Sequence, residues 1–348
     1  MAETLLPGSL TPKMALQRLI DHTDFTHEEM LEIMRQIMSG EFTTIQIAGF
    51  LSALRVKGET VTEIAAAAQV MRDLSSKVEI TDTRHLIDTC GTGGAPNKVF
   101  NVSTASAFVA AGAGAKIAKH GGRAASSKSG SADVLEALGV NIGLTPEQVV
   151  RCVNEAGIGF MFAPNHHAAM KYAAPVRREL GVRTMFNLLG PMTNPAGAKR
   201  QVMGVFHRDL VPLLAQTLQK LGSEHVMVVH SADEMDEISF SADTYVAELK
   251  DGKVSEYTLN PTQFGMPLHD INSIRVESAQ HSSEIILGLL SGEKGPARDI
   301  VLLNAGAAIY VSGLADDLPS GIAQAAQSID SGVALSKLQQ LKALSQAA

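Results

Sequence analysis

The pattern of apolar residues changes once along this chain of 348 residues, near residue 80. Before that point, apolar residues recur at helical spacing. From residue 85 onward, short apolar runs alternate with helical segments. Alternating strands and helices favour a mainly parallel sheet covered by helices on both faces. We therefore expect an α/β fold, with a small helical domain over 1–80, on which the helical segment 166–190 is a candidate to pack, and a larger α/β domain over 81–348.

Capping signals predict the helices of the first domain. Thr26 with Glu29, and Thr43 with Gln46, have the spacing of a capping box, and a third helix is predicted to begin at 60–63. Three or four short helices bury little apolar surface on their own. The domain is therefore expected to pack on the rest of the chain or on a second copy of itself.

Short apolar runs bounded by glycine predict the elements of the second domain. Strands are predicted at 85–89, 115–118, 160–162, 202–206 and 225–229, a hairpin at 245–249 and 254–259, and helices at 104–113, 133–138, 145–157 and 211–221.

Charge and cysteine content exclude several classes of function. Acidic residues exceed basic ones, 36 to 29, so the chain has no evident attraction for nucleic acid or an anionic membrane. No run approaches the roughly 20 apolar residues that span a bilayer, and the first residues lack the features of a signal peptide. Cys90 and Cys152 are expected to be reduced thiols, so we expect a cytoplasmic protein with no nucleic-acid or membrane partner.

Two glycine-containing segments have the features of anion sites. The sequence GTGG at 91–94 is followed by NVST at 101–104, at the start of an apolar helix. The segment KHGGR at 119–123 precedes a serine-rich run at 126–131 and another helix. Exposed backbone N–H groups, helix N-termini and cations suit phosphate, whereas tight turns with ordinary capping would use the same residues. Two such segments suggest one ligand with two phosphate groups.

An acidic segment follows the strand predicted at 225–229. Carboxylates at the carboxyl end of a strand lie where open α/β sheets bind ligands, and Mg²⁺ takes one or two of them. For Asp233 and Glu234 we favour a solvated loop, whereas Asp236 and Glu237 are candidate ligands. The neighbours His166 and His167 do not face one point on a helix, so a metal pair is not expected.

Several longer motifs agree, in order, with a known family. They are GTGG at 91–94, FNVST at 100–104, KHG at 119–121, SSKSGSAD at 126–133, VRREL at 176–180, FNLLGP at 186–191, TNP at 193–195 and the acidic pair at 236–237. The chain resembles the anthranilate phosphoribosyltransferases, members of the nucleoside-phosphorylase-like phosphoribosyltransferases, over nearly its whole length.

The resemblance implies a Mg²⁺-assisted transfer from 5-phosphoribosyl 1-pyrophosphate (PRPP) to anthranilate, the second step of tryptophan biosynthesis from chorismate. It implies a homodimer, no covalent intermediate and no side chain acting as acid, base or nucleophile. The implied donor-binding residues are Gly91, Gly94, Ala95, Asn101, Val102, Ser103, Thr104, Lys119, Gly121, Ser127 and Ser131. The implied acceptor-binding residues are Gly91, His120, Gly122 and Arg177, and the implied metal ligands are Ser103, Asp236 and Glu237.

The chain departs from the family pattern at a few positions. Ala95 stands where the glycine loop usually continues with Asp, and Gly122 stands where many members have Asn. Ser231 and the pair 234–235 replace the usual glycines and leucine before the acidic pair. The alternatives are a pyrimidine nucleoside phosphorylase, a non-catalytic relative that binds nucleic acid, and a scaffold. The acidic pair and the motif around Arg177 favour the phosphoribosyltransferase.

Overall fold

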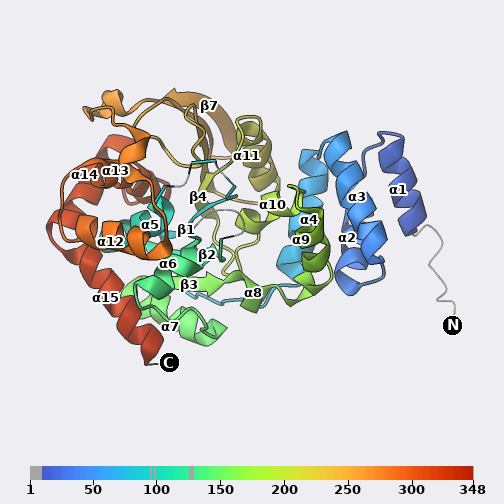
Figure 1. Cartoon of the computed structure of the whole chain (residues 1–348), viewed down its shortest axis with the longest axis horizontal. Helices are drawn as coiled ribbons and strands as arrows, with labels where there is room; N and C mark the ends of the chain where they lie inside the picture. Colours follow the sequence, from blue (N-terminus) through green and yellow to red (C-terminus); the bar gives the residue numbers. More distant parts are fainter. Residues whose placement is uncertain (1–9, 95, 98, 125–128, 348) are drawn as a thin grey trace. The chain divides into compact units, whose positions relative to one another are not determined.

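The computed structural model describes residues 10–94, 96–97, 99–124 and 129–347, which form two compact units (Figure 1). The first unit comprises the residues up to Ser75 together with His167–Thr193. The second comprises Ser76–His166 and the residues from Asn194 onward. The helical unit thus ends at Ser75 rather than at residue 80, and it includes a segment that lies more than 90 residues further along the chain.

All the secondary-structure elements described in the first unit are helices. Its helices are α1 (Pro12–Ile20), α2 (His27–Ser39), α3 (Thr44–Lys57), α4 (Val61–Asp73), η1 (Ala168–Lys171), α9 (Ala174–Leu180), α10 (Phe186–Leu189) and η2 (Gly190–Met192). The predicted capping boxes at the starts of α2 and α3 are confirmed, because in each the threonine side chain and the Glu or Gln three residues later exchange hydrogen bonds with the backbone. The predicted start of the third helix is also confirmed, and Thr60 and Glu63 form a further capping box there.

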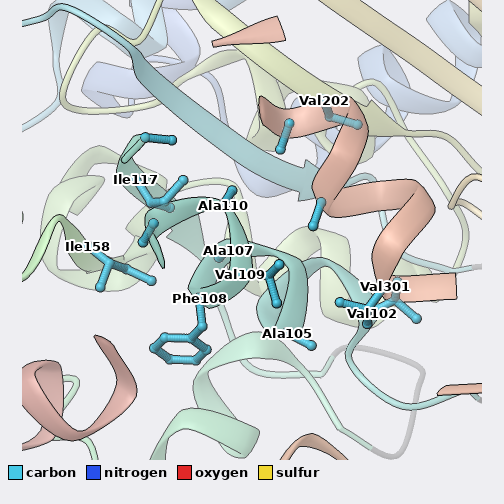
Figure 2. Packing of buried hydrophobic residues seen from close by; sticks show 14 of the residues in the cluster. Val102, Ala105, Ala107, Phe108, Val109, Ala110, Ile117, Ile158, Val202 and Val301 are labelled. Carbon is cyan, nitrogen blue, oxygen red and sulfur yellow. The ribbon is translucent and has the colours of Figure 1, made fainter. Parts of the chain in front are cut away.

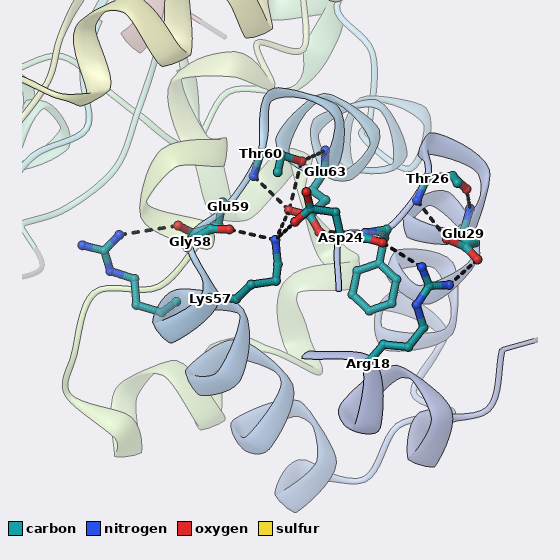
Figure 3. A network of polar contacts seen from close by, with 11 residues as sticks. Arg18, Asp24, Thr26, Glu29, Lys57, Gly58, Glu59, Thr60 and Glu63 are labelled. Atoms are coloured by element: carbon teal, nitrogen blue, oxygen red, sulfur yellow. Dashed lines mark hydrogen bonds and ion pairs between the residues drawn. The ribbon is translucent and has the colours of Figure 1, made fainter. Parts of the chain in front are cut away.

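A buried polar network joins three of these helix ends (Figure 3). Lys57 Nζ, at the end of α3, donates to Asp24 Oδ1 at 2.5 Å and to Glu63 Oε2 at 3.0 Å. Glu63 in α4 also accepts from the backbone N–H groups of Phe25 at 3.0 Å and Thr60 at 2.9 Å. The side chains of Lys57 and Glu63 are 4% and 0% exposed, so each buried charge here has its partner in place.

The second unit is built on a seven-stranded sheet of order β3-β2-β1-β4-β5-β6-β7. The strands are β1 (Leu86–Gly91), β2 (Lys116–Gly121), β3 (Ile158–Phe162), β4 (Arg200–Gly204), β5 (His225–Ser231), β6 (Thr244–Lys250) and β7 (Lys253–Leu259). The first five are parallel, whereas β6 and β7 are antiparallel and form the predicted hairpin. The predicted α/β fold with a mainly parallel sheet is confirmed.

The helices of the second unit flank this sheet (Figure 1). They are α5 (Val102–Gly112), α6 (Ser131–Ala137), α7 (Pro146–Ala156), α8 (Ala163–His166), α11 (Leu210–Lys220), η3 (Pro261–Phe264), η4 (Ile271–Ile274), α12 (Ala279–Leu290), α13 (Pro296–Val311), α14 (Leu318–Asp330) and α15 (Val333–Gln346). Helices α12 to α15 lie beyond the elements that the sequence predicted. Among the described helices, none has both the length and the apolar character needed to cross a membrane.

The alanine-rich helix α5 lies at the centre of the core (Figure 2). Its residues Ala105, Ala107 and Phe108 are fully buried, and it packs against α13, α14 and α15. Small side chains allow neighbouring helices to approach closely, so that close packing fixes α5. The N-terminus of α5 is thereby held at the edge of the sheet.

Candidate active site

The two glycine-containing loops and the acidic loop leave the same edge of the sheet. They follow the carboxyl ends of β1, β2 and β5, and β4 lies between β1 and β5. The chain leaves β1 toward β2 on one side and later returns beside β1 as β4. This point is a topological switch point, where open α/β sheets bind ligands.

The first glycine loop packs closely against the acidic loop. Gly91 ends β1, and a Cβ atom there would lie 2.9 Å from Asp236 Oδ2. Gly93 has a φ of 67°, a conformation that favours glycine. Asn97 Nδ2 donates to the backbone oxygen of Asp233 at 2.5 Å. The two loops are therefore fixed to each other; Ala95 lies outside the described residues.

Asn101 joins the two anion-site loops. It precedes α5 but does not cap that helix with its side chain. Its Oδ1 accepts from the hydroxyls of Ser129 and Ser282, each at 2.8 Å, and its Nδ2 donates to the Ser129 carbonyl at 3.1 Å. The side chain thus connects the first loop, the second loop and α12. Ser282 was not among the predicted residues, because 181 positions separate it from Asn101.

A buried lysine lies beneath the first turn of α5. Lys119 in β2 is 2% exposed, and its ammonium group donates to the Thr89 carbonyl and to Ser103 Oγ, the latter at 3.3 Å. Burial lowers the pKa of Lys119, and the neighbouring carboxylates of Asp88 and Glu237 act against that shift. A cation held here is suited to stabilise negative charge at the N-terminus of α5.

Two other predicted donor ligands of α5 point into the protein. The Val102 side chain belongs to the core (Figure 2). Thr104 is 1% exposed, and its Oγ1 has no hydrogen-bond partner within the described residues. A buried hydroxyl without a hydrogen-bond partner carries a cost in stability.

In the second loop, Gly121 is closely packed, and Arg123 pairs with acidic residues of the protein. A Cβ atom on Gly121 would lie 2.2 Å from Ser131 Oγ, whereas one on Gly122 would meet no atom within 4 Å. Arg123 forms ion pairs with Asp133 at 3.0 Å and Glu136 at 2.5 Å. Its charge is therefore engaged on the protein, contrary to its grouping with the phosphate-binding cations. Ser127 lies outside the described residues.

A buried carboxylate that the sequence did not single out supports His120. Asp88 in β1 accepts from the His120 backbone N–H at 3.2 Å and from Asn194 Nδ2 at 2.7 Å. Burial raises the pKa of Asp88 to about 6. Asn194 belongs to one of the family motifs at 193–195, and that motif was the available signal for this contact.

The acidic pair is packed onto the ends of two strands. A Cβ atom on Gly204, the last residue of β4, would lie 1.6 Å from the Asp236 carbonyl oxygen. The Glu237 carboxylate accepts from the Ser103 backbone N–H at 3.2 Å. Burial raises the pKa of Asp236, although a hydrogen bond from the Gly93 N–H opposes this. Burial and the neighbouring Asp236 raise the pKa of Glu237 to about 8.

The rest of the acidic loop corrects one prediction. Asp233 is not simply solvated: its carboxylate accepts from the hydroxyls of Ser231, Ser239 and Ser241, the second at 2.7 Å. Asp233 therefore joins the end of β5 to the residues that follow the acidic pair. Glu234 is exposed, as predicted.

The donor set fits a hard divalent cation. Asp236, Glu237 and Ser103 offer oxygen atoms, and two adjacent carboxylates with raised pKa values gain from a nearby cation. Within the described ranges, no group of three or more His, Cys, Asp or Glu side chains is arranged to hold a metal ion. Mg²⁺ typically takes one or two protein carboxylates and completes its shell with water and phosphate oxygens.

Arg177 belongs to the helical unit. It lies in α9, which begins with Pro175 in its first turn. Its guanidinium carbon lies 5.4 Å from the centre of the Phe186 ring, and burial lowers its pKa. A guanidinium group suits two-point binding of a carboxylate.

The helical bundle and the α/β unit match the two domains of a glycosyl transferase family. The chain matches the models described as "Glycosyl transferase family, helical bundle domain" over residues 13–75 and "Glycosyl transferase family, a/b domain" over residues 83–335. It is 86% identical to the anthranilate phosphoribosyltransferase of Methylobacillus flagellatus, covering 98% of this chain and 100% of that protein.

Solved structures agree with this. The anthranilate phosphoribosyltransferase of Thermus thermophilus matches with a TM-score of 0.90 and 40% identity, over 95% of this chain and 99% of that one. The enzyme of Saccharomyces cerevisiae, in complex with PRPP and Mg, matches with a TM-score of 0.83 and 27% identity, over 98% of this chain and 95% of that one. The chain belongs to the anthranilate phosphoribosyltransferase family.

Proposed function

We propose that the edge of the sheet at the ends of β1, β2, β4 and β5 is where this chain binds PRPP and transfers its phosphoribosyl group to the amine of anthranilate. The products are N-(5-phosphoribosyl)anthranilate and pyrophosphate, in tryptophan biosynthesis. One observation carries the placement: a glycine loop, the N-terminus of α5, the buried cation of Lys119 and the pair Asp236–Glu237 converge at that edge.

The donor is held by backbone N–H groups and by Lys119. Glycines leave the amides of the first loop accessible, and the dipole of α5 favours an anion at its first turn. The proposed donor ligands are Gly91, Gly94, Ala95, Asn101, Val102, Ser103, Thr104, Lys119, Gly121, Ser127 and Ser131.

Mg²⁺ is proposed to bind Asp236, Glu237 and Ser103. The raised pKa values of the two carboxylates and the oxygen chemistry of all three groups support this. When bound, the ion supplies positive charge to the pyrophosphate group that leaves. The yeast enzyme with PRPP and Mg is the related structure that holds both groups.

The acceptor is proposed to contact Gly91, His120, Gly122 and Arg177. Arg177 offers a guanidinium for the carboxylate of anthranilate. In the reaction, the bond between ribose C1 and the pyrophosphate oxygen breaks, and the amine nitrogen bonds to C1 and loses a proton. The aromatic amine is a weak nucleophile, so its position against C1 matters more than its deprotonation.

The test is the loss of anthranilate fluorescence when purified protein, PRPP and magnesium are mixed. We expect a rapid loss that a chelator abolishes. Nucleosides with phosphate serve as the control for a phosphorylase. No loss of fluorescence, with folded protein and both substrates at saturation, would refute the proposal. An unchanged Michaelis constant for anthranilate in Arg177→Ala would remove only Arg177 from the acceptor site.

A homodimer that forms through the helical unit is also proposed. Of the exposed large apolar side chains among the described residues, several lie on α1 and α3: Met14, Ile20, Ile45 and Val56, which are 50% to 83% exposed. Exposed apolar side chains on helices that contact each other, as α1 and α3 do, support association through these helices. Light scattering after gel filtration should give a dimer, and Ile45→Asp should shift it toward a monomer; an unchanged mass for this variant would place the interface elsewhere.

A cytoplasmic location is the remaining proposal. Cys90 and Cys152 are free and buried. Reduced thiols of this kind are typical of a reducing compartment. Fractionation of cells that express a tagged chain is the check.

A further inference from the structure

A single amide side chain binds the backbone directly behind the acidic pair. Asn304 lies in the middle of α13 and is 2% exposed. Its Oδ1 accepts from the N–H of Ile238 at 2.9 Å, and its Nδ2 donates to the carbonyl of the same residue at 2.9 Å. Nδ2 also donates to the Ile300 carbonyl on its own helix at 2.9 Å. Both hydrogens of the amide are used.

Ile238 follows Asp236 and Glu237 directly, in the irregular segment between β5 and β6. Outside a sheet, its buried N–H and carbonyl need partners from another element, and Asn304 provides both. The start of the same segment is fixed by Ser231, whose N–H donates to the Met235 carbonyl at 3.0 Å. The acidic pair thus lies between two anchored points, one on β5 and one on α13.

Asn304 and Glu237 line the same small cavity of about 10 Å³, together with Ser103 and Thr89. This cavity adjoins the hydrogen bond between the Glu237 carboxylate and the Ser103 N–H at the start of α5.

We propose that Asn304 is a positioning residue for the metal ligands: by fixing both backbone groups of Ile238, it sets the direction in which the Asp236 and Glu237 carboxylates point. Groups behind metal ligands typically contribute 10- to 100-fold to metal affinity or activity. The inference rests on the metal site of the proposed function. The proposal assigns a role to Asn304 in α13, a helix that contains none of the sequence motifs.

The test compares Asn304→Ala with Ser328→Ala. Ser328 is a matched control, because its buried hydroxyl also bonds a backbone carbonyl, that of Val109 at 2.8 Å, but on the far part of α5. We expect Asn304→Ala to raise the Mg²⁺ concentration for half-maximal activity about tenfold at saturating PRPP and anthranilate. Ser328→Ala should lower the melting temperature and leave that concentration unchanged.

Two further measurements do not depend on turnover. Titration of Mn²⁺ with pyrophosphate present, followed by electron paramagnetic resonance, should show the same loss of affinity in Asn304→Ala. Hydrogen exchange should become faster in a peptide that contains Ile238, while β5 stays protected. If Asn304→Ala lowers the melting temperature but keeps metal affinity within twofold of the wild type, Asn304 is only structural and the proposal is wrong.

A second pair of variants separates the possible failures. Asn304→Leu has a similar volume and also loses all three hydrogen bonds, so it replaces the alanine variant if that variant does not fold. Asp236→Asn tests the metal site itself. If Asp236→Asn leaves Mn²⁺ binding unchanged, the metal assignment and this inference both fail. If Asp236→Asn weakens binding and neither Asn304 variant does, only this inference fails.

Discussion

Lys57 of the helical network and the charged residues of the candidate site in the α/β unit are both buried, but burial affects their charges differently. In the helical unit, burial acts to lower the pKa of Lys57, but hydrogen bonds from Lys57 to Asp24 and Glu63 outweigh it and raise the pKa. In the α/β unit, burial prevails: it raises the pKa values of Asp236 and Glu237 and lowers that of Lys119. The surrounding protein therefore favours the charged form of Lys57, whereas it disfavours the charged forms of Asp236, Glu237 and Lys119.

This difference in pKa shift distinguishes charges that stabilise the fold from charges that are available to bind a ligand. A buried charge with all its partners on the protein has nothing left to bind. Charges held in their less favourable state gain when a ligand of opposite charge arrives, so they mark a site. The acidic pair and Lys119 together can receive a cation and an anion, which matches a magnesium ion and a phosphorylated donor.

The largest expected effect comes from neutralising the acidic pair. Asp236→Asn with Glu237→Gln should lower kcat/KM by about 10³-fold, because both proposed carboxylate ligands are lost. The melting temperature at pH 8 without magnesium should rise, since two disfavoured charges are removed. Steady-state kinetics and thermal unfolding check the two halves. A melting temperature that falls by several degrees would mean that the pair is structural, like the network in the helical unit.

The opposite result is expected for the helical network. Lys57→Met leaves the fully buried Glu63 without its cation, which should destabilise the protein by about 3 kcal/mol. The folded variant should keep its activity. Urea unfolding measures the first effect, and Lys57→Met with Glu63→Gln is the control, because a neutral amide no longer needs the lysine. A loss below about 1 kcal/mol would show that the pair is not needed for stability.

The contrast also explains how much could be predicted from the sequence. The capping boxes of Thr26 and Thr43 were predictable because each couples two residues three positions apart. The strands were predictable because short apolar runs form buried parallel strands. The acidic pair and both glycine loops are also local motifs, and family resemblance identified them.

The contacts that hold the site together are long-range. Asn304 lies 66 residues from Ile238, and Ser282 lies 181 residues from Asn101. Asn304 belongs to α13 and Ser282 belongs to α12, two helices that the sequence analysis did not predict. Asp233 was misinterpreted for a related reason, because the serines that bind it meet only when β5 and β6 pair. Hydrogen bonds between distant segments leave no spacing that a single sequence can reveal.

A smaller effect should follow from steric displacement of the acidic loop. Gly204→Ala would place a Cβ atom 1.6 Å from the Asp236 carbonyl oxygen, so the loop must move. We expect a fall of about 100-fold in kcat/KM, because small misplacements of catalytic groups are costly.

The control for this prediction is Gly190→Ala. A Cβ atom on Gly190 would meet no atom within 4 Å, so this variant should retain activity. Equal activity of the Gly204 and Gly190 variants would contradict the prediction. Gly197→Ala is not a suitable control because Gly197 has a positive φ of 64°, and Gly122→Ala is not suitable because Gly122 is a proposed acceptor ligand.

The smallest effect concerns Glu248, a carboxylate in the α/β unit whose hydrogen-bond partners all belong to the protein. It tests whether disfavoured charges mark the candidate site or are a property of the whole α/β unit. Burial acts to raise the pKa of Glu248, but hydrogen bonds from His225, Tyr310 and Tyr257 outweigh it and lower the pKa to about 2. A lowered acid pKa stabilises the fold above the unfolded value near 4.5, and this contribution disappears as the pH falls toward 2. Glu248→Gln should therefore be less stable than the wild type by about 1 kcal/mol at pH 7, and the difference should shrink between pH 4.5 and pH 2. Urea unfolding at a series of pH values measures it, and kcat/KM should stay unchanged, because Glu248 lies outside the proposed site. A difference independent of pH would show that packing, rather than the paired charge, makes Glu248 stabilising.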